Sequence, residues 1–114
     1  MVLEIGEKLY IISRRLFEKD LRRHFVGEVV ACNSSQARIR GYAFVYDDNS
    51  NNFLRREELR TRIFSLTDAG YIINLLPGDT VLEDIRYVTD QENHRLITDG
   101  KTFNLNVSEF SAIR

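Results

Sequence analysis

Short apolar runs separated by polar turns dominate the chain from Lys8 to Val88, and helical periodicity is rare. Residues 37–46 alternate with period two, so arginines and large aromatic residues share one face and small or aliphatic residues share the other. Residues 71–76 form a nearly continuous apolar run, which is typical of a strand buried on both faces. The pattern predicts an all-β chain.

Turn-forming residues divide these runs into hairpins. The polar turn 33–36 joins strands predicted over 24–32 and 37–46, and Gly27 allows the first of these strands to bend sharply. The six residues 47–52 all favour turns and predict a loop. After Pro77-Gly78-Asp79, residues 80–88 predict a strand, or a short turn followed by one. Asp99-Gly100 predicts a hairpin whose second strand alternates over 102–107.

The N-terminal segment is ambiguous between strand and helix. Residues 8–17 are rich in β-branched and aromatic residues, but apolar residues also recur there at helical spacing. We favour a strand because Tyr10-Ile11-Ile12 is a poor helical triplet. An N-terminal helix within residues 3–23 stays open as the alternative.

These elements predict one domain over residues 1–114, with a barrel over 8–88 and an appended hairpin and tail over 89–114. The predicted fold is a small, strongly bent antiparallel barrel of five to six strands. Glycine at a strand bend and a tight turn before a later strand are features that such a barrel needs. The OB-fold is the alternative barrel.

Composition narrows the function classes. The formal net charge is −1, but the chain carries an excess of +3 up to Arg62 and of −4 beyond it, and 13 of its 16 cationic residues are arginine. Cys32 is the only cysteine, and with only His24 and His94 there is no zinc-binding pattern. We expect no disulfide, no secretory signal and no membrane span, and therefore a cytoplasmic protein.

No catalytic constellation is visible. Aspartates at five predicted turns could supply paired carboxylates, but no matched histidine, cysteine or serine accompanies them. The loop 47–52 carries oxygen ligands suited to calcium, yet it lacks the order of an EF-hand and predicts a solvent loop. We therefore expect no enzyme activity, no cofactor and no metal.

Arginines with interleaved aromatic residues are the sharper signal. If their strands are neighbours, several of the arginines would form one basic strip beside Tyr42, Phe44 and Phe64. The candidates are Arg22-Arg23-His24, Arg38, Arg40, Arg55-Arg56, Arg60 and Arg62. Arginine and aromatic side chains together suit single-stranded RNA, because they neutralise phosphates and stack on bases. The alternative is that Arg60 and Arg62 pair with Glu57, Glu58 or acids of a neighbouring strand.

Two segments resemble the motifs of the Sm-like (LSM-type) family. Phe25-Val26-Gly27-Glu28-Val29 is similar to the aromatic-x-Gly-x-apolar step at the bend of that family's second strand. Residues 77–85 resemble its second motif, with Pro77 in place of arginine. The family's Asp-x-apolar-Asn loop is replaced by residues 33–36. Both departures fall where the family builds its uridine pocket.

The resemblance implies a bent five-stranded barrel, assembly into homo-oligomeric rings, and RNA as a partner. The strand over 71–76 would then be the intersubunit strand. We hypothesise a non-enzymatic oligomer that binds single-stranded RNA through residues of its own. The proposed RNA-binding residues are Asn33, Ser34, Gln36, Arg38, Arg40, Tyr42, Arg60 and Arg62. The alternative, favoured by the near-neutral charge, is a protein–protein interaction or structural module that binds no nucleic acid.

Overall fold

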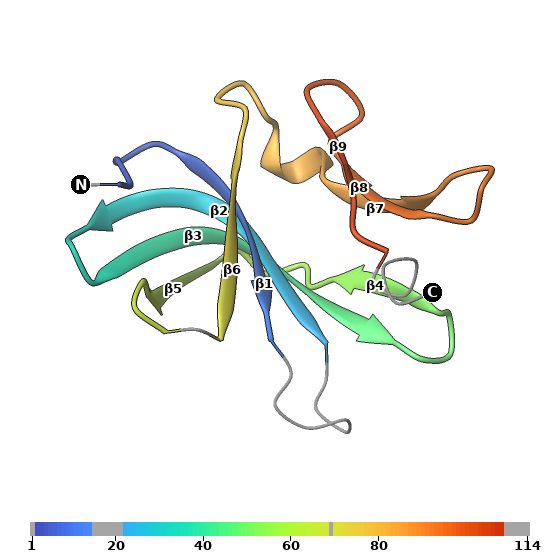
Figure 1. Cartoon of the computed structure of the whole chain (residues 1–114), viewed down its shortest axis with the longest axis horizontal. Coiled ribbons are helices and arrows are strands. Elements are labelled where there is room, and N and C mark those ends of the chain that lie inside the picture. Colours follow the sequence, from blue (N-terminus) through green and yellow to red (C-terminus); the bar gives the residue numbers. More distant parts are fainter. Residues whose placement is uncertain (1, 15–21, 69, 109–114) are drawn as a thin grey trace. The chain divides into compact units, whose positions relative to one another are not determined.

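The computed structural model describes residues 2–14, 22–68 and 70–108. These residues form nine strands and one short 3-10 helix without any α-helix, which confirms the all-β prediction. The chain divides after Gly78 into two compact units (Figure 1). The first unit holds β1 (Lys8–Ser13), β2 (Arg23–Cys32), β3 (Gln36–Asp47), β4 (Asn52–Arg55), β5 (Arg60–Ser65) and β6 (Tyr71–Leu76). The second holds η1 (Leu82–Asp84), β7 (Arg86–Thr89), β8 (Arg95–Thr98) and β9 (Asn104–Asn106).

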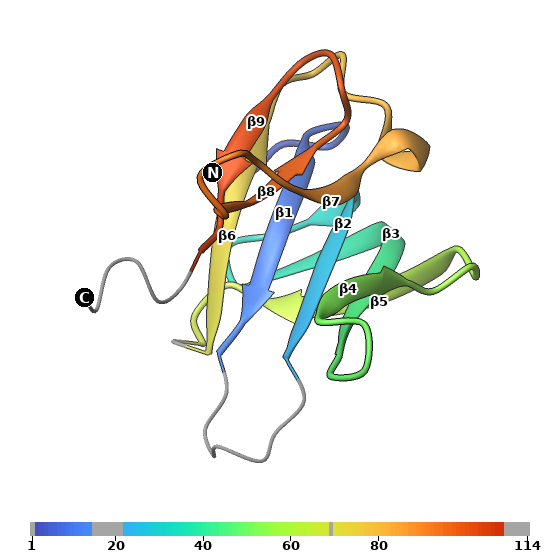
Figure 2. The same cartoon turned by 90° about the vertical axis from the view of Figure 1, so that its right-hand side faces the viewer.

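The first unit is an antiparallel sheet organised around the long strand β3. Its strand order is β4-β3-β2-β1-β6, and β5 also pairs with β3. β3 pairs with β2 on one side; on the other side its residues 36–41 pair with β5 and its residues 44–47 pair with β4. β4 and β5 therefore share one edge of the sheet, while β6 forms the other. Figure 2 shows β6, β1 and β2 side by side.

A close approach of the β2 and β3 backbones explains why glycine stands at position 27 of β2. Gly27 lies opposite Gly41 of β3. A Cβ atom added to Gly41 would lie 1.8 Å from the carbonyl oxygen of Val26, and one added to Gly27 would lie 2.6 Å from the carbonyl oxygen of Arg40. Only glycine fits at such distances. The register of β2 against β3 also shifts between Val29 and Ala31, as at a β-bulge.

The core of the first unit lies on one face of this sheet, here called the inner face; the opposite face is the outer face. Alternation along the strands places its members at every second position. Buried residues of the core are Leu3, Leu9, Ile11, Phe25, Val29, Ala37, Ile39, Ala43 and Phe64. Tyr10, Val26 and Phe44 on the outer face are also buried. The prediction that both faces are covered along residues 41–45 is confirmed at Ala43 and Phe44.

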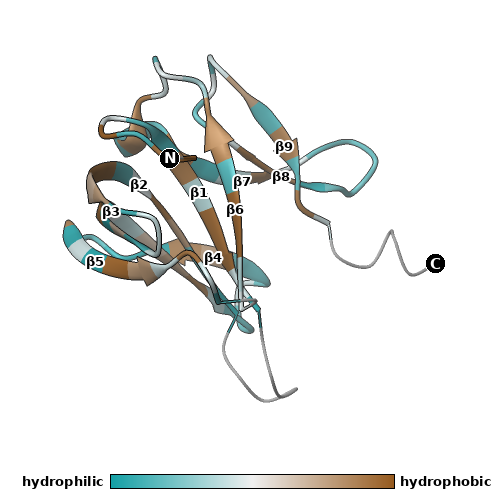
Figure 3. Cartoon of the chain, turned by 60° about the vertical axis from the view of Figure 1, so that its left-hand side comes forward, coloured by the Kyte–Doolittle hydropathy of each residue, from teal (hydrophilic) through white to brown (hydrophobic). Residues whose placement is uncertain are grey.

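The strands do not close into a barrel. The predicted all-β, antiparallel class is therefore confirmed, but the predicted barrel is not. Among the described residues, β5 pairs only with β3 and β6 pairs only with β1. Aromatic side chains, rather than backbone hydrogen bonds, span the gap between the two strands: the ring centroids of Phe64 and Tyr71 lie 5.2 Å apart. Two sheet edges therefore stay open. Figure 3 shows that β6 is largely apolar, yet Ile72 and Leu75 are exposed, so the predicted burial of this strand on both faces is wrong.

Residues 8–13 form a strand, which resolves the N-terminal ambiguity between strand and helix. The predicted strand extended to residue 17, and residues 15–17 lie outside the described part of the chain. No helix is present in the described residues of 3–23. Leu9, Tyr10 and Ile11 are all buried in succession. A strand covered on both faces has no polar face, and this explains why its periodicity was ambiguous.

The second unit is a three-stranded antiparallel sheet with the order β7-β8-β9. The predicted boundary at residue 88 is wrong, because β7 pairs with β8 and so belongs with the appended hairpin. Residues 80–88 are not one strand; the turn followed by a strand is confirmed, with η1 preceding β7. The hairpin at Asp99-Gly100 is confirmed, and Gly100 has a φ of +85°.

Candidate functional site

The outer face of β3 carries the predicted arginine positions. Arg38 and Arg40 are exposed and Tyr42 is half-buried, whereas the alternating Ala37 and Ile39 are buried on the inner face. The predicted division of β3 into two faces is therefore confirmed. At the usual rise per residue, two positions along a strand span roughly 7 Å, so the guanidinium groups of Arg38 and Arg40 start from neighbouring points on one surface.

Arg38, Arg40 and Tyr42 have chemically different neighbours on the sheet. Arg40 lies opposite Glu28 of β2, so an opposite charge accompanies it. Arg38 lies opposite Ala31 on one side and Ile63 on the other. Both residues opposite Arg38 are therefore apolar. The guanidinium carbon of Arg55 lies 5.0 Å from the centre of the Tyr42 ring. Tyr42 is thus already paired with a cation, as in a cation–π contact.

The turn between β2 and β3 is held by the side chain of Asn33. Its Oδ1 accepts hydrogen bonds from the backbone N–H groups of Ser35 and Gln36, both at 2.9 Å. The backbone carbonyl of Ser35 accepts a hydrogen bond from the N–H of Leu66 at 2.8 Å. Asn33 is therefore a structural residue of the turn, and Ser34 and Gln36 are exposed on it.

Two hollows flank this turn. The smaller, about 150 Å³, is lined by Ala31, Cys32, Asn33, Gln36, Arg38 and Ile63. The larger, about 470 Å³, is lined mainly by apolar side chains, together with the turn: Val2, Leu3, Asn33, Ser34, Leu66, Ile73 and Leu75. The structure therefore brings together four of the predicted RNA-binding residues, namely Asn33, Ser34, Gln36 and Arg38, at one end of the sheet.

Arg60 and Arg62 do not join the strip on β3, which corrects the predicted convergence. In the pairing of β5 with β3, Ile63 lies opposite Arg38 and Thr61 lies opposite Arg40. Directly opposed residues point to the same face, so Ile63 and Thr61 share the outer face. Arg60 and Arg62 alternate with them and lie on the inner face. The predicted basic strip is therefore divided between two faces.

The alternative prediction of ion pairing for these arginines is confirmed in one instance. Nη2 of Arg60 lies 3.7 Å from Oε2 of Glu58. Both side chains are solvent-accessible, and an exposed ion pair of this kind contributes roughly 0–1 kcal/mol. The pair therefore explains little of the stability of β5.

Sequence reasoning missed an aromatic cluster on the outer face. His24 is buried; its Nδ1 lies 2.8 Å from the hydroxyl oxygen of Tyr10, and its ring stacks on Phe53 at 4.3 Å. Arg22 lies 4.0 Å from the centre of the Tyr46 ring. The period-two placement of Phe44 and Tyr46 in the sequence could have indicated an aromatic face on β3. The other members of the cluster could not be predicted, because they come from β1, β2 and β4 and lie far apart in sequence.

The buried aspartate of the second unit has a structural role. Asp99 is 3% exposed. Its Oδ1 accepts hydrogen bonds from the N–H groups of Lys101 and Thr102 at 2.9 and 2.7 Å, and its Oδ2 accepts one from the Thr102 hydroxyl at 2.7 Å. Burial alone would raise the pKa of Asp99, but these hydrogen bonds, with one from Val81, hold the pKa well below its usual range.

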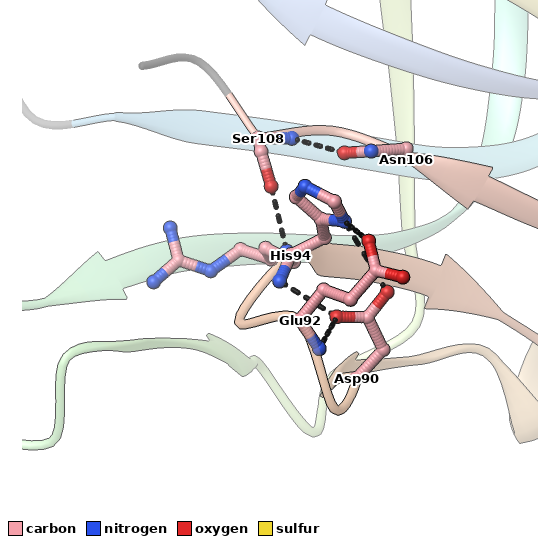
Figure 4. A network of polar contacts seen from close by, with 6 residues as sticks. Asp90, Glu92, His94, Asn106 and Ser108 are labelled. Atoms are coloured by element: carbon pink, nitrogen blue, oxygen red, sulfur yellow. Dashed lines mark hydrogen bonds and ion pairs between the residues drawn. The ribbon is translucent and has the colours of Figure 1, made fainter. Parts of the chain in front are cut away.

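Asp90 organises the turn between β7 and β8 in the same way. Its Oδ1 accepts hydrogen bonds from the N–H groups of Glu92 and His94 at 2.9 and 2.8 Å (Figure 4). The Nδ1 of His94 lies 3.4 Å from the Asp90 carboxylate and 3.7 Å from that of Glu92. Hydrogen bonding to His94 contributes most to lowering the pKa of Asp90. These contacts are local to one turn and explain why aspartate stands there.

Neither metal-binding groups nor membrane-spanning helices are found in the described residues, and similarity to known proteins adds no assignment. The described residues contain no group of three histidine, cysteine or acidic side chains placed to hold a metal ion. Within the same residues, no helix has the length and apolarity to cross a membrane. No family model, curated protein or solved structure matches the chain.

Proposed function

We propose that this chain is a non-enzymatic, self-associating β module whose copies join through the two open edges of the first unit. The observation that carries the proposal is that both edge strands expose apolar side chains. Ile63 of β5 is 61% exposed, and Ile72 and Leu75 of β6 are 50% and 59% exposed. Unpaired strand edges that carry exposed apolar residues favour pairing with another strand.

The two edges differ in sequence, so a β5 edge of one copy would meet a β6 edge of the next. Such a head-to-tail contact repeats and closes into a ring when the rotation between copies allows it. The resemblance of residues 25–29 to an Sm-like motif supports the same assembly. Residues 77–85 add less support, because η1 occupies the part of that segment where the motif has a strand, and β6, which precedes the segment, pairs with β1.

Light scattering after size exclusion tests the assembly. We expect the full chain to elute at a multiple of its 13.3 kDa mass, and a lysine at the edge, Ile72→Lys or Ile63→Lys, to convert it to a monomer. The matched control is Ile5→Lys, which changes a residue of similar exposure (71%) outside the strands. A wild-type chain that stays monomeric at all concentrations would contradict the proposal.

A second candidate function is binding of single-stranded RNA on the outer face. The specific observation in its favour is that Arg38 and Arg40 are both exposed on this face, and that Arg38 lines the small hollow together with Gln36. We propose that Tyr42 and the turn 33–36 extend this surface. Guanidinium groups would neutralise phosphates while exposed bases stack on an aromatic ring or a guanidinium plane.

Fluorescence anisotropy with oligo-U and oligo-A at two salt concentrations tests the RNA candidate. We expect Arg40→Gln to weaken binding of both sequences and to lower the salt slope by about one. Arg86→Gln, an exposed arginine in the second unit, is the control and should leave affinity unchanged. An oligomer without RNA affinity would support the assembly function and exclude this second one.

A further inference from the structure

Three arginines gather on the inner face, apart from the outer strip. Arg60 and Arg62 come from β5, and Arg23 comes from the start of β2. Arg23 lies opposite Ser13 and Arg60 lies opposite Gly41, and both pairings put these arginines on the face that carries the core. We call Arg23, Arg60 and Arg62 the inner arginine cluster.

A row of aromatic rings lies next to this cluster. The rings of Phe25 and Phe64 are 5.3 Å apart, and Phe64 and Tyr71 are 5.2 Å apart, so the row runs from β2 through β5 to β6. The guanidinium carbon of Arg62 lies 5.6 Å from the centre of the Phe25 ring.

The positive charges of the cluster repel one another. Burial contributes most to lowering the pKa of Arg62, and repulsion from Arg60 and then from Arg23 adds to this effect. The carboxylate of Glu58, 71% exposed, is the acidic group paired with Arg60. In residues 2–14, 22–68 and 70–108, no ion pair is found for Arg23 or Arg62.

We propose that the inner arginine cluster binds a small phosphate-bearing anion. Guanidinium groups match phosphate oxygens with paired N–H donors, and three of them on one face suit a multiply charged phosphate. A bound anion would also relieve the repulsion among the three cations. The inference does not depend on self-association or on RNA binding at the outer face.

Calorimetric titration of the full chain with sodium pyrophosphate in low salt tests the site. We expect one pyrophosphate per chain, with affinity reduced at least tenfold in Arg62→Gln and in Arg23→Gln. Arg86→Gln removes an exposed arginine of the second unit and should change affinity less than twofold. Arg23 is exposed, so its variant keeps the test valid if Arg62→Gln fails to fold.

Arginine side-chain NMR gives a second readout. Pyrophosphate should shift the Nε–H signals of the inner arginine cluster and leave that of Arg38 in place. The proposal is overturned if the wild type shows no binding at millimolar pyrophosphate, or if Arg86→Gln loses as much affinity as Arg23→Gln. It is also overturned if oligo-U, rather than pyrophosphate, shifts the cluster signals, since the cluster would then belong to an RNA surface.

Discussion

The two units of the molecule are stabilised by different means. The first unit buries an apolar core on the inner face of a six-stranded sheet. In the second unit, three of the six buried residues among those described are polar, namely Thr80, Thr98 and Asp99. A sheet of three short strands has little apolar surface to bury, so side-chain hydrogen bonds take a larger share of its local order. The comparison predicts that steric changes should damage the first unit most and polar changes the second.

The largest effect should come from the crossing of β2 and β3. Gly41→Ala places a methyl group 1.8 Å from a backbone carbonyl oxygen, which cannot be avoided without moving the strand. We expect a loss of about 3 kcal/mol in the free energy of unfolding, measured by urea denaturation. Gly78→Ala is the matched control, because nothing lies within 4 Å of its added Cβ. Equal stability of the two variants would show that the crossing tolerates a side chain.

The carboxylate of Asp99 should rank second and should reveal the polar character of the second unit. Asp99→Asn replaces one of the two acceptor oxygens with an N–H donor. It therefore removes the acceptor either for the Lys101 and Thr102 amides or for the Val81 amide and the Thr102 hydroxyl, and we expect a cost of about 2 kcal/mol, seen as faster hydrogen exchange of the β8 amides. Thr67→Ser is a conservative exposed control in the first unit. Unchanged exchange in Asp99→Asn would assign the order of β8 to its apolar contacts instead.

Lowering the pH should destabilise the second unit through the protonation of Asp99. The pKa of Asp99 is lower in the folded than in the unfolded chain, so its contribution to stability is complete above the unfolded pKa of about 4. That contribution is lost as the pH falls from there toward the folded pKa. Protection of the β8 amides should therefore decrease below about pH 4 in the wild type and decrease less in Asp99→Asn. Parallel curves for the two proteins would contradict this assignment.

The smallest effect should come from the turn of the first unit. Asn33→Ala removes an acceptor for the N–H groups of Ser35 and Gln36, and we expect a cost of about 1 kcal/mol in urea denaturation. Ser34→Ala, next to it and exposed, should cost less than half of that. If both cost the same, Asn33 is not the residue that holds the turn.

Much of the local structure was predictable from sequence because it depends on near neighbours. The alternation along β3 predicted that Arg38, Arg40 and Tyr42 share a face, and Asp99-Gly100 predicted its hairpin. The boundary between the units was missed, because nothing in residues 80–88 shows that β7 pairs with β8 rather than with the larger sheet. The buried pair of His24 and Tyr10 was missed for a similar reason, since 14 positions separate them.

The sequence by itself determined the strand class, the turns and the two faces of each strand, because side chains of a strand alternate with period two. Only the tertiary structure decided which faces of different strands lie on the same side of the sheet. The register of β5 against β3 places Ile63 opposite Arg38, and this parity puts Arg60 and Arg62 on the inner face. A slip of one residue would reverse that choice without altering the local pattern of either strand. Pairing between strands also decided that β5 and β6 stay unpaired with each other, which leaves both edges open.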